Sequence, residues 1–186
     1  MLPPEIRFAV AVALLMVAMF PVAGFTAEQD VPDFAMVQKA AEQGGAEAQS
    51  NLGFMYVKGQ GVPKDEAKAV HWWTKAAEQG DAVAQNNLGV MYAKGQGVPK
   101  DEAKAAQLFQ KAVVVLQKEA EHGDARAQYN LGNGYYNGVG VPKDDAKAVH
   151  WWAKAAEQGD AEVLKHLGIM AKQGNESAKK ALERLK

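Results

Sequence analysis

The sequence of 186 residues contains no cysteine. Disulfides, thiolate metal sites and thiol nucleophiles are therefore excluded. The sequence also has little net charge, since 22 acidic and 21 basic residues leave a formal charge of -1. Because lysine and arginine do not gather into a basic stripe, we expect no nucleic-acid partner.

Long apolar runs are absent too, except for one short run near the N-terminus. It extends from Phe8 to Phe20, follows Arg7, and ends at Pro21. A run of roughly 13 residues is short for a membrane span, and a basic residue, an apolar run and then small residues are typical of a secretory signal peptide. We expect residues 1–27 to be a signal peptide cleaved between positions 23 and 27, which makes the mature chain periplasmic or secreted. The alternative is a chain anchored in the membrane by the uncleaved segment.

The rest of the chain is dominated by an internal repeat. Segments that begin at Ala46, Ala82 and Ala125 share the motifs AQxNLG and GVPKD, and a degenerate copy begins at Ala161. The third start comes about seven residues later than the first spacing predicts. The expected divisions are 28–45 (an N-terminal half-repeat or cap helix), 46–81 (repeat 1), 82–124 (repeat 2 with a seven-residue insertion), 125–160 (repeat 3) and 161–186 (a degenerate repeat or C-terminal cap).

Each repeat is predicted to form two helices. Asp81 and Asp124 stand where the side chain of an N-cap residue accepts a backbone N–H of the following helix. Leu52 and Tyr56 lie on one face of the first helix. The second helix carries a wide apolar face, which must be covered on more than one side, as in a stacked array. The expected structural core is Leu52, Gly53, Tyr56, Trp73, Leu88, Gly89, Tyr92, Leu131, Gly132 and Trp152.

The phrase KAVHWW occurs at Lys68–Trp73 and again at Lys147–Trp152. Because its spacing follows the repeat, we interpret the paired tryptophans as structural residues that fill the space between helices in each repeat. His71 and His150 occupy equivalent places and are separated by the repeat, so we expect them not to converge on a metal. No metal and no cofactor are expected.

These repeated motifs resemble those of the Sel-one-like repeat (SLR) family, whose members are relatives of the tetratricopeptide repeats. The resemblance rests on AQxNLGxMYxxGxGVPKDxAKAxxWWxKAAEQGDA from Gln49 to Ala82 and covers nearly all of the chain after residue 34. It implies an all-α fold, a right-handed α/α solenoid of stacked helix-turn-helix repeats. It also implies a concave face that binds another protein or a peptide. Exported bacterial members of the family resemble adaptors in envelope signalling, polysaccharide export or host interaction.

Four positions in the first helix differ from repeat to repeat, and their spacing places them on one helical stripe. The corresponding positions contact ligands in the tetratricopeptide relatives, so the resemblance implies a groove there. The alternative is a solvated stripe in which Phe54 and Val90 pack against a neighbouring repeat. The candidate partner-binding residues are Ser50, Phe54, Val57, Asn86, Val90, Arg126, Tyr129, Asn133, Tyr136 and Ile169.

The additional residues of repeat 2 lie within Lys111–Asp124. Seven residues add two helical turns with little change of phase, so we expect one longer second helix whose end overhangs the stack. Val113, Val114, Val115 and Leu116 cannot all face inward on one helix. They are either a locally adapted core or a contact surface for a partner or a second copy.

The function that these features favour is a non-enzymatic protein–protein interaction scaffold or adaptor of the bacterial cell envelope. A first alternative is an envelope hydrolase of the β-lactamase-like type, because SAKK at Ser177–Lys180 matches the S-x-x-K pattern, although its S-D-N and K-T-G partners are absent. A second alternative is a membrane-anchored structural component that self-associates through Val113–Leu116. The identity of the partner and the oligomeric state are left open by the sequence.

Overall fold

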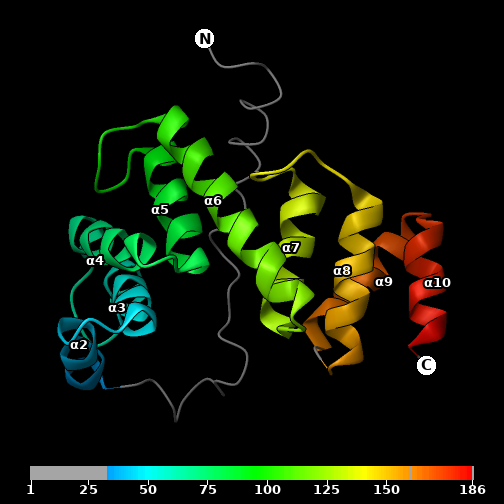
Figure 1. Cartoon of the computed structure of the whole chain (residues 1–186), viewed down its shortest axis with the longest axis horizontal. Helices are drawn as coiled ribbons and strands as arrows, with labels where there is room; N and C mark the ends of the chain where they lie inside the picture. Colours follow the sequence, from blue (N-terminus) through cyan, green and yellow to red (C-terminus); the bar gives the residue numbers. More distant parts are fainter. Residues whose placement is uncertain (1–32, 160, 186) are drawn as a thin grey trace. The chain divides into compact units, whose positions relative to one another are not determined.

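The computed structural model describes residues 33–159 and 161–185, and every regular element in those ranges is an α-helix (Figure 1). The predicted signal peptide lies outside the described residues. The helices are α2 (Phe34–Glu42), α3 (Ala46–Lys58), α4 (Glu66–Glu78), α5 (Ala82–Lys94), α6 (Glu102–Glu121), α7 (Ala125–Asn137), α8 (Asp145–Glu157), α9 (Ala161–Lys172) and α10 (Glu176–Arg184). They pack pairwise in sequence order, so the all-helical prediction is confirmed, and the arrangement is consistent with an SLR α/α solenoid.

Capping side chains fix where the helices begin. Asp81 accepts a hydrogen bond from the backbone N–H of Ala84 at 2.6 Å, as the N-cap of α5. At the C-terminal end Asn175 accepts from Ala178 at 3.0 Å. Each bond satisfies a backbone donor that has no partner inside the helix.

Two kinds of turn alternate along the chain. The turn after α3 begins with Gly59 at φ 72° and leads through the GVPKD segment to α4. The turn after α4 is shorter and carries Gly80 at φ 90°. Both glycines adopt the left-handed conformation that lets a helix end in a tight turn. The turn after α9 contains Gly174 at φ 94° and is also short, so it belongs to the second kind.

The chain divides into two packing units, and the boundary falls inside α6. Unit 1 is the described part of Met1–Ala112, and unit 2 is the described part of Val113–Lys186. In unit 1 the core gathers around Leu52, which is 0% exposed, and Trp73, which is 4% exposed. The indole N–H of Trp73 donates to the carbonyl oxygen of Ser50 at 3.0 Å, so its only polar atom is satisfied.

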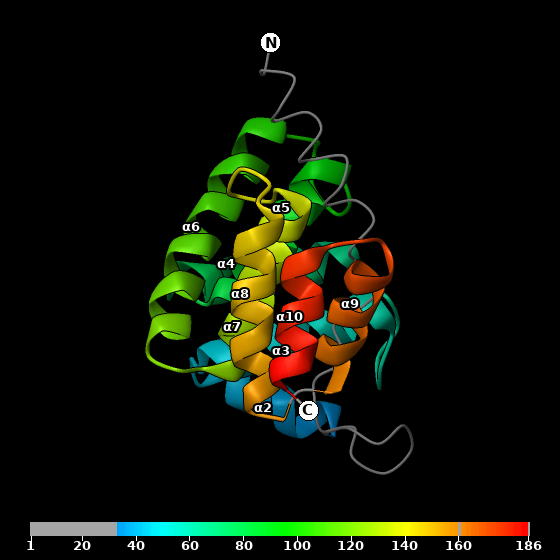
Figure 2. The same cartoon turned by 90° about the vertical axis from the view of Figure 1, so that its right-hand side faces the viewer.

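Unit 2 has a core of its own around Trp152 and Leu167. The indole N–H of Trp152 donates to the carbonyl oxygen of Tyr129 at 3.3 Å. Figure 2 shows α8, α9 and α10 beside one another, and all three contact each other. α10 also forms an ion pair with α8, from Arg184 to Glu157 at 2.9 Å.

In each of the three complete repeats, a glycine of the first helix allows an aromatic ring of the second helix to come close. A Cβ atom added to Gly53 would lie 2.6 Å from Nε1 of Trp73, and one added to Gly89 would lie 2.7 Å from Cε1 of Phe109. Gly132 meets the indole of Trp152 in the same way. Repeat 2 therefore keeps this contact although a phenylalanine replaces the tryptophan.

Glutamines clamp consecutive helices together. The side-chain N–H of Gln49 donates to the carbonyl oxygen of Ala41 at 3.1 Å, and its side-chain oxygen accepts from Gln79 at 2.7 Å. Gln128 makes the equivalent bonds with Ala120 and Gln158.

The clamp of repeat 2 is incomplete. Gln85 donates to the carbonyl oxygen of Ala77 at 3.2 Å, but its buried side-chain oxygen has no hydrogen-bond donor. Gln79 stands six positions after Trp73. Six positions after Phe109 the sequence places Val115, which has no group to donate.

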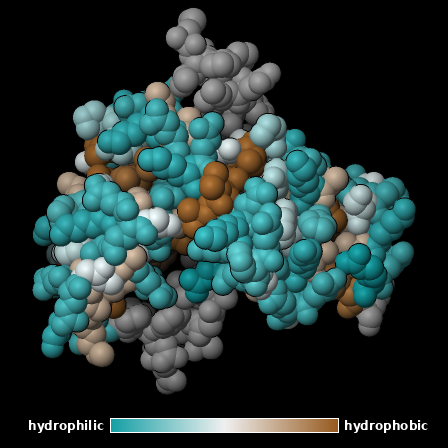
Figure 3. Space-filling model, viewed as in Figure 1, coloured by the Kyte–Doolittle hydropathy of each residue, from teal (hydrophilic) through white to brown (hydrophobic). Residues whose placement is uncertain are grey.

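The insertion makes α6 one continuous helix of 20 residues, which confirms the prediction of a longer second helix. Val113 and Leu116 are buried at 7% and 9% exposure, whereas Val114 is 70% exposed. Hydrophobic residues reach the surface along the middle of α6 (Figure 3). Among the described residues, no helix is long and apolar enough to cross a membrane.

Candidate binding surface

The ten candidate partner-binding residues differ widely in exposure. Three side chains are buried, and a partner cannot reach them in this structure: Ser50, Val90 and Asn133. Five are half-buried: Phe54, Val57, Asn86, Tyr129 and Tyr136. Arg126 and Ile169 are exposed. The stripe is therefore not a uniformly open surface, and its members have different roles.

Ser50 has a structural role. Its hydroxyl donates to Oδ1 of Asp81 at 3.2 Å, and its carbonyl oxygen accepts from Trp73. Burial raises the pKa of Asp81, and the nearby Glu47 raises it further, although hydrogen bonds from Ala84 and Ser50 act in the opposite direction. Ser50 thus tethers α3 to the start of α5.

Phe54 and Val57 contribute to the core of unit 1 from its edge, because both pack against its buried residues. The ammonium group of Lys58 lies 5.4 Å from the centre of the Phe54 ring, which is within the range of a cation–π contact. These contacts fit the alternative that part of the stripe serves packing between repeats.

In unit 2 the stripe leads into a group of packed rings, which we call the aromatic cluster: Tyr129, Tyr136, Trp152 and His166. The ring of His166 lies 5.8 Å from that of Tyr129 and 5.3 Å from that of Trp152. Tyr136 lies 5.3 Å from Trp152 on another side. Trp152 is buried, whereas the other three residues are half-buried.

Basic groups border the aromatic cluster. Arg126 is exposed one turn before Tyr129 on α7, and the ammonium group of Lys143 lies 5.2 Å from the centre of the Tyr136 ring. Tyrosine and arginine are the residue types that most often carry binding energy at protein interfaces. This surface can therefore accept a segment with apolar and acidic side chains.

Sequence reasoning did not include His166 and Lys143 in the binding surface. The signal for His166 was present, because it stands where the three complete repeats have asparagine, as at Asn51. Its ring contacts depend on the packing of α9 against α8, which a single sequence does not show.

The paired tryptophans have two roles rather than one. Trp73 and Trp152 are core residues, and Trp72 and Trp151 are half-buried. Trp72 still packs against the core of unit 1, so the structural interpretation applies to it in part. Trp72 lies between the exposed ring of His71, at 5.3 Å, and the ammonium group of Lys75, at 4.7 Å.

The same arrangement recurs around Trp151 in unit 2. There the centre of the His150 ring and the ammonium nitrogen of Lys154 each lie 5.1 Å from the centre of the Trp151 ring. His71 and His150 are exposed. No group of three or more histidine, aspartate or glutamate side chains in the described ranges is placed to hold a metal ion.

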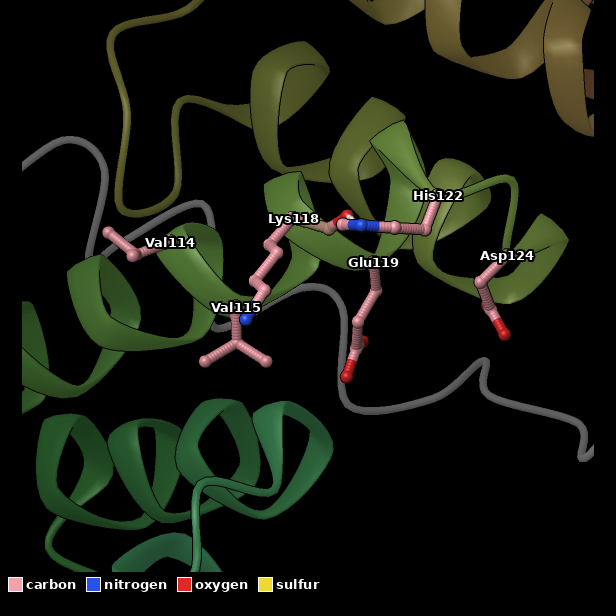
Figure 4. A pocket seen from close by; sticks show the side chains of 6 residues that line it. All are labelled: Val114, Val115, Lys118, Glu119, His122 and Asp124. Carbon is pink, nitrogen blue, oxygen red and sulfur yellow. Dashed lines mark hydrogen bonds between the residues drawn. The ribbon is translucent and has the colours of Figure 1, made fainter.

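α6 borders a shallow hollow in unit 2 (Figure 4). Its lining residues are Val114, Val115, Lys118, Glu119, His122 and Asp124. Nδ1 of His122 lies 2.6 Å from the carbonyl oxygen of Lys118, so that nitrogen is already engaged. Ser177 is the candidate nucleophile of the hydrolase alternative. It is exposed on α10 and is not one of the residues that line this hollow.

The family model of the Sel1 repeat matches residues 46–81, 82–113 and 125–160. The chain belongs to the Sel1 repeat family. The resemblance recognised from AQxNLG and GVPKD is thereby confirmed. The first and third matches cover the two-helix units α3–α4 and α7–α8. The second match covers α5 and the first part of α6, and it leaves out residues 114–124, where α6 continues.

Solved structures of Sel1-like proteins are similar to this chain. A protective antigen of uropathogenic Escherichia coli strains that displays an SLR fold shares 42% identity over 75% of this chain, with a TM-score of 0.51. A Sel1 repeat protein from Oxalobacter formigenes shares 42% identity over 70% of the chain, with a TM-score of 0.45. Helicobacter pylori cysteine rich protein B shares 27% over 69%, with a TM-score of 0.43.

The chain spans only part of the first two of these proteins, 28% of the E. coli antigen and 51% of the O. formigenes protein, against 87% of the H. pylori protein. No match is found among curated proteins. Sel1 repeats form a class of protein-interaction scaffold, and this chain is a member of that class.

Proposed function

We propose that this Sel1 repeat protein is a non-enzymatic adaptor of the bacterial cell envelope that binds a segment of another protein on the aromatic cluster. The observation that carries the proposal is the combination of half-buried tyrosine rings with exposed Arg126 on α7. Tyr129 and Tyr136 are held by Trp152 and His166, so they would lose little conformational entropy on binding.

The envelope location of this adaptor rests on the N-terminal sequence, where Arg7, an apolar run and Pro21 follow the order of a signal peptide. Mass spectrometry of the mature N-terminus tests it. A first residue between positions 24 and 28 is expected, and an intact N-terminus would instead favour the membrane-anchored form.

Site-specific photo-crosslinking in the native cell tests the binding surface. A crosslinking residue at Tyr129 should capture one discrete partner, whereas the same residue at Glu183, exposed on α10, should capture none. The purified partner should then bind the wild-type protein more tightly than the Arg126→Glu variant, because a basic group at the edge of the cluster is reversed. Equal capture at both positions, or unchanged affinity of Arg126→Glu, would remove this surface from the function.

A further inference from the structure

We draw no further inference here: the strongest candidate, the shallow hollow along the second half of α6 that Val114, Lys118 and His122 help to line, is an open helix face of mixed charge, and nothing in the structure shows what covers it.

Discussion

At the scale of single residues, the same substitution is expected to have opposite effects at equivalent glycines. Gly53→Ala places a methyl group 2.6 Å from the indole of Trp73, in a core without room for it, and should destabilise the protein by about 1–3 kcal/mol. Gly168→Ala meets nothing within 4 Å and removes a flexible residue from a helix interior, so it should stabilise by about 0.5–1 kcal/mol.

Urea unfolding of the two glycine variants and of the wild type measures both changes. The contrast depends on the indole that closes on Gly53 and is missing at Gly168. Two free-energy changes of the same sign would contradict the open space beside α9.

A second expectation at this scale concerns Asp81, whose pKa is raised by burial above the ordinary value of 3.8. A raised folded-state pKa means that the native state binds a proton more readily than the unfolded state. The contribution of Asp81 to stability therefore falls as pH rises from about 3.8 through its folded-state pKa. Asp81→Asn keeps a side-chain oxygen for capping α5 but stays neutral at every pH.

The free energy of unfolding of Asp81→Asn relative to the wild type should therefore increase between pH 4 and pH 7. Comparing the two proteins at each pH cancels the titration of the other carboxylates. The matched control is Asp124→Asn, because Asp124 caps α7 in the same way but is exposed. A difference that is flat with pH, or that decreases, would show that hydrogen bonds from Ser50 and Ala84 outweigh burial.

At the scale of the helix, α6 separates adjacent valines into different environments. Val113 is 7% exposed and Val114 is 70% exposed, so an aspartate should be costly at the first position and tolerated at the second. We expect Val113→Asp to destabilise by about 3 kcal/mol or more, because a charge is buried without a partner. Val114→Asp should change stability by less than about 0.5 kcal/mol.

The same pair of variants tests self-association. Thermal melts give the stability difference, and sedimentation of Val114→Asp against the wild type shows whether this surface joins two copies. A wild-type oligomer that dissociates in the folded Val114→Asp variant would establish α6 as an interface. An unchanged sedimentation coefficient would remove that alternative.

The sequence was a good guide to the helices and a poorer one to exposure. Asp81 and Gly59 mark a helix start and a helix end through local hydrogen bonds and backbone conformation, which depend on neighbouring residues only. The environment of Trp72 could not be predicted in this way, because its neighbour Trp73 has the same residue type and lies on another side of the helix. The oxygen of Gln85 was also unpredictable, since its missing donor depends on where an inserted segment continues the helix.

At the scale of the whole molecule, the two packing units have separate cores, and repeat proteins gain stability mainly from neighbouring repeats. Trp152→Ala removes a side chain that is 1% exposed and should cost about 3–5 kcal/mol. Because Trp152 belongs to the core of unit 2, hydrogen exchange should accelerate in α7–α10 while α3 and α4 keep their protection.

Trp73→Ala is the reciprocal variant. It is expected to accelerate hydrogen exchange in α3 and α4 and to leave the exchange of α9 unchanged. Equal acceleration in both units for either variant would mean that continuous α6 makes them unfold as one cooperative body, and amide exchange followed by mass spectrometry resolves the two outcomes helix by helix.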